Sequence, residues 1–164
     1  MRERGFTLIE MLVVVLVMGL LAGLAAAALR PAGADALKVE AERLARLLDL
    51  AGEEARLGGK PVAWTSNGQG YQFWRWRNGV GWMEIRDNDA LRERRLAGGS
   101  SIAGLRIDGV PVRDGMRLEF SPYGTDHAYA VTLAQEDERY AVLGSPVGEV
   151  SVVREAAAAA ALTP

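Results

Sequence analysis

Hydrophobic residues form one long run near the start of the chain, and this run predicts a transmembrane helix. Residues 6–29 are apolar or small apart from Thr7 and one charged residue, Glu10. As a helix, this segment would rise about 36 Å, which exceeds the roughly 30 Å of a bilayer's hydrocarbon core. A secretory signal peptide is the alternative, since the alanines at 25–28 resemble a cleavage site. The apolar region of such a peptide is only about 7–15 residues long, so the length of the run favours a transmembrane helix over 6–29.

The hydrophobic spacing then changes to alternating steps of four and three, which predicts an amphipathic helix within residues 30–59. Its apolar positions are Leu37, Ala41, Leu44, Leu48, Ala51 and Ala55. Asp35 is expected to cap the start of this helix, and Gly-Gly-Lys-Pro at 58–61 is expected to stop it. Arg-Pro-Ala-Gly at 30–33 is expected to bend or interrupt the chain between the two helices. Packing on the protein's own sheet is favoured for this stripe over a separate coiled coil.

Beyond residue 60 the pattern changes to short β-rich runs separated by turn residues, which predicts an antiparallel β domain over residues 60–155. The predicted strands are 62–65, 71–77, 80–86, 91–96, 102–107, 117–120, 128–134, 139–143 and 149–154. Asn78-Gly79 predicts a two-residue hairpin loop with a type I′ turn. Residues 156–164 are expected to form a disordered tail. The predicted fold class is therefore α+β.

Composition excludes several kinds of site. The formal net charge of −2 argues against a protein whose main task is to coat nucleic acid or an anionic membrane. The chain has no cysteine and one histidine, His127, which excludes disulfides, thiolate sites and sites that need two imidazoles. It contains no glycine-rich phosphate loop and no nucleophile elbow. We therefore predict no catalytic residues, no metal and no cofactor.

The residues that precede and open the apolar run carry a more specific signal. Arg-Glu-Arg at 2–4 is followed by Gly5 and Phe6, and Glu10 lies five residues after Gly5. This arrangement resembles the class III signal of type IV pilins and type II secretion pseudopilins. The resemblance implies that prepilin peptidase removes a leader, residues 1–5, by cutting between Gly5 and Phe6, and that Phe6 is then N-methylated. It also implies that Glu10 matches the family's glutamate at the fifth position after the cut.

The electrostatics of lipid agree with a role for Glu10 in assembly. A lone carboxylate within hydrocarbon costs about 2.5 kcal/mol or more. Pairing with the new amino group of Phe6, in the same or a neighbouring subunit, lowers this cost and would set the axial register between subunits. A position at the headgroup boundary is the alternative for Glu10. The net positive leader is expected to stay in the cytoplasm, which places the residues after Leu29 in the periplasm.

Four features of the β-rich part resemble the H-type minor pseudopilin domain, or GspH domain, which a branch of minor type IV pilins shares. They are Gly-Lys-Pro-Val at 59–62, the aromatic hairpin at 70–82, Leu-Glu-Phe-Ser-Pro-Tyr-Gly at 118–124 and the strand at 148–152. The resemblance implies a pilin-like lollipop, in which a long N-terminal transmembrane and amphipathic helix packs on an antiparallel β domain.

The same resemblance implies a function. It points to a minor pseudopilin of the type II secretion system, a single-pass inner-membrane subunit that joins the tip region of a periplasmic pseudopilus and supports secretion of folded proteins. Its expected partners are prepilin peptidase, the other minor pseudopilins and the major pseudopilin, with secreted proteins as further candidates and no nucleic acid. The alternatives are a minor type IV pilin for pilus priming, adhesion or DNA uptake, and an enzyme anchored by an uncleaved signal.

Tryptophans and arginines interleave in the aromatic hairpin. Trp74 and Trp76 alternate with Arg75 and Arg77, and Trp82 follows. On a strand, this alternation places the indoles and the guanidinium groups on opposite faces. Core packing of all four indoles of the chain, including that of Trp64, with solvated arginines is the favoured interpretation. A protein-partner surface formed by the five hairpin residues and a single-stranded nucleic-acid site are the alternatives.

Three smaller clusters are weaker candidates. The arginines within 92–95 are diluted by neighbouring acids, which favours a solvated face over a DNA site. Residues 87–89 with Glu84 offer oxygen ligands but lack the spacing of a calcium loop. His127 is expected to be a loop histidine.

Overall fold

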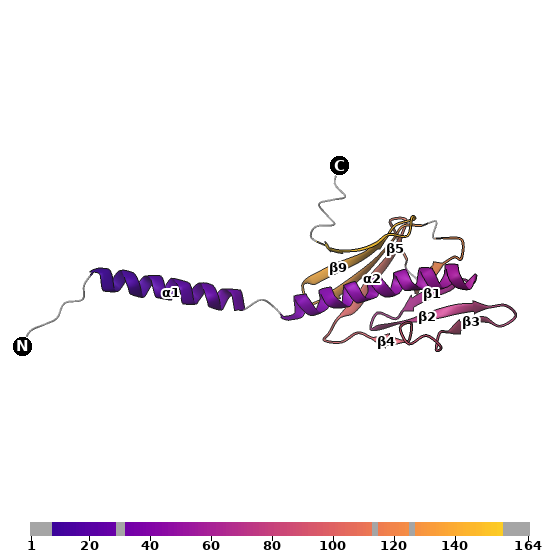
Figure 1. Ribbon diagram of the computed structural model, residues 1–164, viewed down its shortest axis with the longest axis horizontal. Coiled ribbons are helices and arrows are strands. Elements are labelled where there is room, and N and C mark those ends of the chain that lie inside the picture. Colours follow the sequence, from indigo (N-terminus) through magenta and orange to yellow (C-terminus); the bar gives the residue numbers. More distant parts are fainter. Residues whose placement is uncertain (1–7, 29–31, 113–114, 125–126, 156–164) are drawn as a thin grey trace, which may run out of the picture. The chain divides into compact units, whose positions relative to one another are not determined.

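The computed structural model describes residues 8–28, 32–112, 115–124 and 127–155 (Figure 1). The chain divides into two compact units, Met1–Ala32 and Gly33–Pro164. The leader with Gly5, the methylation position Phe6, residues 30–31 of the expected interruption and the expected tail at 156–164 lie outside the described residues. Ala32 and Gly33, the other two residues of the expected interruption, already belong to the second helix, Ala32–Gly58.

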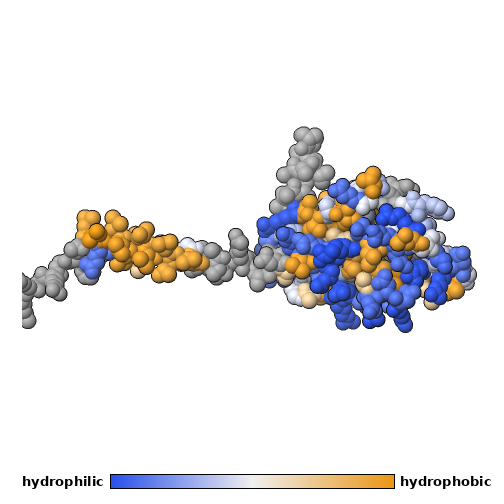
Figure 2. Space-filling model, in the orientation of Figure 1, coloured by the Kyte–Doolittle hydropathy of each residue, from blue (hydrophilic) through white to orange (hydrophobic). Residues whose placement is uncertain are grey.

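Helix α1, Leu8–Ala28, is apolar on all sides. Its described side chains, from Leu8 to Leu24, are exposed, and Figure 2 colours nearly all of their surface as hydrophobic. A helix without a polar face is typical of helices that other molecules bury on every side. Glu10, in the first turn, is the one acidic residue of α1. Within the described part of the chain, no helix combines the length and the hydropathy of a membrane crossing.

Helix α2, Ala32–Gly58, carries its apolar stripe into the core of the second unit. All six predicted stripe positions have 0% exposure, which confirms the predicted packing on the protein's own sheets. The helix stops as predicted, since Gly59 has a φ of 61°, the left-handed conformation of many C-cap glycines. The prediction of Asp35 as N-cap is wrong, because the helical backbone already begins at Ala32.

Two antiparallel sheets form the rest of this unit, and α2 lies across them, with β1–β4 on one side of its axis and β5 and β9 on the other (Figure 1). Sheet A has the order β3 (Gly81–Glu84), β2 (Gly70–Arg77), β1 (Val62–Ser66) and β7 (Met116–Phe120), and β4 (Arg94–Arg95) pairs with the start of β2. Sheet B has the order β10 (Val150–Arg154), β9 (Glu138–Gly144), β8 (Tyr129–Gln135), β5 (Ser101–Ile107) and β6 (Val110–Pro111). A helix packed on antiparallel sheets confirms the predicted α+β class.

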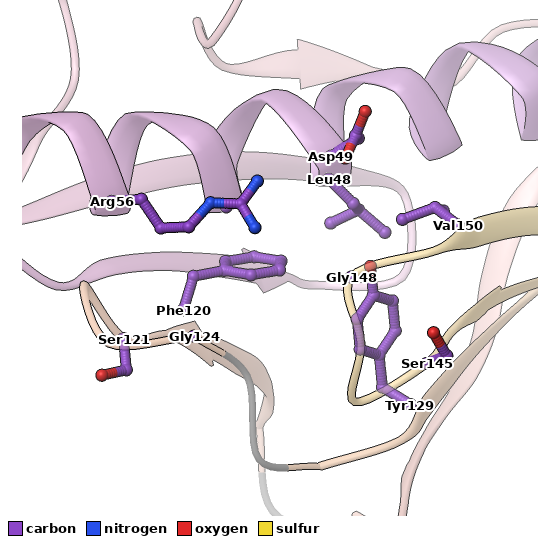
Figure 3. Close-up of a pocket in the computed structure, with 11 residues that line it drawn as sticks. Leu48, Asp49, Arg56, Phe120, Ser121, Gly124, Tyr129, Ser145, Gly148 and Val150 are labelled. Atoms are coloured by element: carbon purple, nitrogen blue, oxygen red, sulfur yellow. The ribbon is translucent and has the colours of Figure 1, made fainter.

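The hydrophobic core lies where α2 meets both sheets. Trp64 and Phe73 of sheet A and Val131 of sheet B are fully buried there together with the stripe of α2. Beneath α2, the rings of Phe120 and Tyr129 meet edge to face with centroids 6.0 Å apart and line a small cavity (Figure 3). Its volume of about 30 Å³ can hold a water molecule but no larger ligand.

The predicted type I′ turn at Asn78-Gly79 is wrong. Arg77 pairs with Gly81, so the loop between β2 and β3 has one residue more than predicted, and the Val80 N–H donates to the Arg77 carbonyl at 3.1 Å. A type I′ turn needs positive φ at both central residues, whereas Gly79 has a φ of 79° and Asn78 is not in the positive-φ region.

The type I′ turn is found between β5 and β6 instead. Ile107 pairs with Val110, and the two residues between them, Asp108 and Gly109, have φ values of 49° and 78°. The Asp-Gly dipeptide is a signal for this turn. Sequence analysis missed it because β6, Val110–Pro111, is too short to show an alternating pattern.

Candidate partner-binding surface

The three tryptophans of the aromatic hairpin share the face of sheet A that points away from α2. Trp76 pairs with Trp82 across β2 and β3, and Trp74 pairs with Ala63 across β2 and β1. Arg75 lies on the opposite face, where its side chain reaches Glu54 of α2. The predicted separation of indoles from guanidinium groups on β2 is therefore confirmed.

Two of the indoles form a contact cluster with an arginine of β7, and Trp74 lies on the same face of β2. We call Trp74, Trp76, Trp82 and Arg117 the aromatic face. Trp76 and Trp82 pack edge to face with centroids 5.4 Å apart, and the guanidinium carbon of Arg117 lies 4.2 Å from the Trp82 ring centroid. The Trp74 Nε1–H donates to Thr65 Oγ1 at 2.8 Å. Edge-to-face and cation–π contacts contribute about 0.5–1.5 kcal/mol each, so they hold these side chains in one arrangement.

The favoured interpretation of the indoles as core residues is confirmed for Trp64 and wrong for the three tryptophans of the aromatic hairpin. The core cluster contains Trp64 but none of the three, and Trp76 is 37% exposed. Ala63, which lies beneath them on the same face, has 0% exposure. The aromatic face is thus a fixed, half-exposed group of tryptophan and arginine side chains, the residue types that are enriched in protein-interface hot spots.

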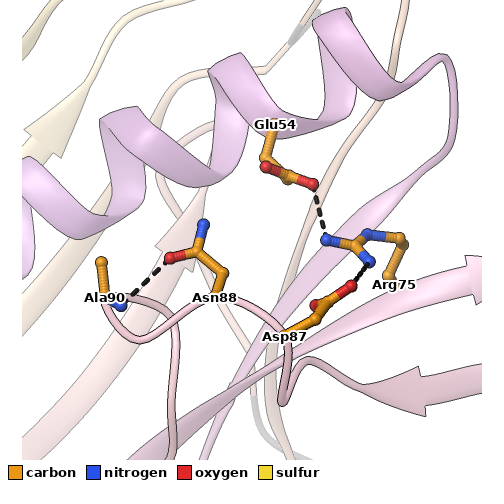
Figure 4. Close-up of polar contacts among 5 residues, drawn as sticks. All are labelled: Glu54, Arg75, Asp87, Asn88 and Ala90. Atoms are coloured by element: carbon orange, nitrogen blue, oxygen red, sulfur yellow. Dashed lines mark hydrogen bonds and ion pairs between the residues drawn. The ribbon is translucent and has the colours of Figure 1, made fainter.

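Arg75 holds elements of the fold together instead of joining the aromatic face. Its terminal nitrogens lie 2.6 Å from Glu54 Oε1 and 2.9 Å from Asp87 Oδ2 (Figure 4). The hydrogen bond with Asp87 is the main cause that raises the pKa of Arg75, and the same bond lowers the pKa of the Asp87 carboxyl. The Arg75 side chain is 20% exposed, so the prediction that it is solvated is wrong. Arg77, at the end of β2, is exposed as predicted.

We expect Arg75→Met to lower the melting temperature of the full chain in detergent by roughly 5 °C, because it leaves Glu54 without its charged donor. Arg77→Met is the matched control and should change it by less than about 1 °C. Because the Asp87 pKa is lowered in the fold, the stability from this pair is present at neutral pH and lost as pH falls through that pKa. The difference between Arg75→Met and the unmodified chain should therefore shrink below about pH 4. Equal melting of both variants at pH 7 would contradict this role.

The candidate calcium ligands are engaged in local contacts. Asp87 pairs with Arg75, Asp89 with Arg92, and Glu84 with Arg86, while Asn88 Oδ1 accepts from the Ala90 N–H at 3.0 Å (Figure 4). Within the described ranges, no group of three or more His, Asp or Glu side chains is arranged to hold a metal ion.

His127 lies in a loop, as predicted, and contacts the turn between β5 and β6. Its Nδ1 lies 2.5 Å from Asp108 Oδ2, and the Ala128 N–H donates to Asp108 Oδ1 at 2.9 Å. The hydrogen bond from His127 is the main cause that lowers the pKa of Asp108. These contacts hold Asp108 in its left-handed conformation.

Comparison with known proteins gives matches to both parts of the chain. A family model described as the prokaryotic N-terminal methylation motif matches residues 1–26, and a second, described as type II transport protein GspH, matches residues 40–148. No curated protein matches the chain.

Two solved structures of the minor pseudopilin EpsH from the type 2 secretion system of Vibrio cholerae resemble this one. The first has a TM-score of 0.56 at 20% identity and covers 73% of this chain and 97% of the EpsH chain. The second has a TM-score of 0.61 at 18% identity, with coverages of 74% and 96%. At these identities the match shows a shared fold. Because the GspH model also spans more than half of the sequence, the protein belongs to the family of the type II transport protein GspH.

Proposed function

We propose that this protein is a minor pseudopilin that assembles at or near the tip of a periplasmic pseudopilus and supports type II secretion. The observation that carries the proposal is the presence of the methylation motif, residues 1–26, and the GspH domain, residues 40–148, in one chain. The helix packed on two antiparallel sheets, which matches EpsH, agrees with it. As a member of a pseudopilin family, the protein is a structural subunit and not an enzyme.

The N-terminal segment has the role of membrane anchor and assembly element in this proposal. Prepilin peptidase cuts between Gly5 and Phe6 and methylates Phe6, and residues 6–29 hold the subunit in the inner membrane until assembly. The absence of a polar face along the described side chains of α1 suits a helix that passes from lipid into the interior of a filament. Glu10 pairs with the amino group of Phe6 in its own or a neighbouring subunit, since a carboxylate in an apolar surrounding needs such a partner.

The second unit supplies partner specificity, with the aromatic face as its contact surface for other pseudopilins. Trp76 and Trp82 hold each other in place, and Arg117 packs on Trp82, before any partner binds. Side chains that are ordered in advance lose little conformational entropy on binding. Trp74, fixed by its hydrogen bond to Thr65, extends the same surface.

Deletion of the gene in its host tests this function. We expect the strain to lose secreted exoprotein activity in the medium while surface twitching stays normal, because the pseudopilus serves secretion and a type IV pilus serves twitching. Complementation with the unmodified gene should restore secretion. Loss of twitching with normal secretion would overturn the proposal and indicate a minor type IV pilin.

A further inference from the structure

Strand β7, Met116–Phe120, forms an edge of sheet A. It pairs with β1 on one side, and no other described strand pairs with it on the other side. An edge strand presents a row of backbone donors and acceptors that an extended chain can satisfy. Which residues of β7 present these groups follows from the hydrogen bonds of β1.

The backbone N–H and C=O groups of successive β1 residues point alternately toward β2 and toward β7. The Trp76 N–H donates to the Pro61 carbonyl at 2.9 Å, and the Asn67 N–H donates to the Gly70 carbonyl at 3.3 Å. The backbone groups of the odd-numbered residues from 61 to 67 therefore point toward β2. The backbone groups of the even-numbered residues 62, 64 and 66 consequently point toward β7.

The alternation of β7 follows from its register with β1. Phe120, Leu118 and Met116 are the partners of the even-numbered residues of β1, so their main-chain groups point toward β1. The N–H and C=O groups of Arg117 and Glu119 consequently point away from the sheet. Among the described residues, no backbone hydrogen bond to Arg117 or Glu119 is found on that side.

A groove of about 500 Å³ lies beside β7. Residues 117–120 of β7 line it together with Ile107, at the end of β5, and His127.

The charges along the edge define which segment fits. The Arg117 Nε lies 2.7 Å from Glu119 Oε1, and both side chains lie on the same side of sheet A as the aromatic face. A strand antiparallel to β7 would place one residue opposite Glu119, the next opposite Leu118 and the next opposite Arg117. Opposite charges favour directly facing cross-strand pairs, so the matching pattern is basic, apolar, acidic.

We infer that the β7 edge is a strand-addition site, at which an extended segment of a partner protein with a basic–apolar–acidic pattern pairs antiparallel with residues 117–119. The N–H and C=O groups of Arg117 and Glu119 make four main-chain hydrogen bonds to it, and the facing charges select its register. The inferred site follows from the geometry of sheet A, so it does not require that the protein lies at a pseudopilus tip.

The probe is a dye-labelled peptide of residues 115–121, Gly-Met-Arg-Leu-Glu-Phe-Ser, which itself carries the required pattern. The full chain in detergent is titrated with this peptide, and binding is followed by fluorescence anisotropy. A peptide with its Arg and Glu exchanged serves as the charge control and should bind several-fold more weakly. Failure of the first peptide to bind, or equal binding of both, would overturn the inference.

Glu119→Pro tests the main-chain contact directly. It removes an N–H that points away from β1, so the sheet should tolerate it, as edge strands tolerate proline. Glu119→Ala is the matched control, since it removes the same side chain and keeps the N–H. We expect the proline variant to bind the peptide at least tenfold more weakly than the alanine variant, with equal melting temperatures. Equal affinity of the two variants would contradict strand addition.

N-methylated peptides keep the test decisive if Glu119→Pro melts early. In the proposed complex, the Arg and Glu amides of the peptide face β7, whereas its Leu amide faces away. Methylation of the first two should abolish binding to the unmodified chain, and methylation of the Leu amide should leave it within about twofold. The same loss at all three positions would overturn the inferred register.

Discussion

Gly144→Ala is expected to lower the free energy of unfolding by about 3 kcal/mol, the upper range for overpacking in a core. Gly144 of β9 faces Tyr129 of β8, and the Tyr129 ring lies directly over it. A Cβ atom at residue 144 would lie 2.1 Å from Cε1 and Cζ of that ring. The ring cannot yield easily, because it is buried beneath α2 and packs edge to face on Phe120 (Figure 3).

Urea unfolding of the full chain in detergent, followed by tryptophan fluorescence, measures this effect. Gly104→Ala is the matched control, because Gly104 also lies in a strand of sheet B and a Cβ there meets nothing within 4 Å. The control should change the free energy of unfolding by less than about 0.5 kcal/mol. The double variant Gly144→Ala with Tyr129→Leu should lose less than the sum of the single changes. If Gly144→Ala unfolds like Gly104→Ala, the ring does not constrain this position.

Gly5→Ala is expected to abolish processing, so that the chain keeps residues 1–5 and Phe6 is not methylated. The reason is the resemblance of residues 1–10 to the class III signal, in which the peptidase cuts after the glycine, together with the match of residues 1–26 to the methylation motif. Intact-mass measurement of the protein purified from host membranes reads both modifications at once. A mass that shows cleavage after residue 5 in this variant would refute the assignment of the signal.

Glu10→Ala separates processing from assembly and serves as the companion variant. It leaves the glycine and the cleavage position unchanged, so cleavage and methylation should be normal. Its recovery in sheared pseudopili should fall, because the subunit lacks the carboxylate that we propose sets its register. Normal recovery would reject that role for Glu10 while leaving the signal assignment untouched.

Local periodicity accounts for the parts of the fold that were predictable. The stripe of α2 was visible in the sequence because helical burial repeats every three to four residues, and all six positions are buried. The longer strands were visible because turn residues interrupt short β-rich runs. The predicted strand at 91–96, in contrast, shrinks to Arg94–Arg95, which pair with Gly70 and Tyr71. A Cβ at Gly70 would lie 2.7 Å from the Arg94 carbonyl oxygen, so this pairing depends on a close approach between distant segments.

The candidate surface was predictable in part. The alternation of side chains along β2 places Trp74 and Trp76 on one face and Arg75 on the other, and the sequence alone predicts this separation. Alternation does not say which of the two faces is turned toward α2, and the tryptophans lie on the other one. Arg117 was missed, because it comes from β7, which enters sheet A next to β1 and far from β2 in the sequence.

Local sequence specifies the apolar N-terminal segment, the helix that packs on the sheets, most strands and the family resemblance, since each depends on residues close together in the chain. Four other features depend on the tertiary structure: the three indoles of the aromatic hairpin lie outside the core, Arg75 joins α2 to sheet A, Tyr129 covers Gly144, and no described strand pairs with the outer edge of β7. These features arise from strand order and register, which bring together residues whose separation along the chain carries no periodic signal. The physical reason is that side-chain alternation specifies two faces of a strand, whereas the neighbours of each face depend on how the whole sheet is assembled.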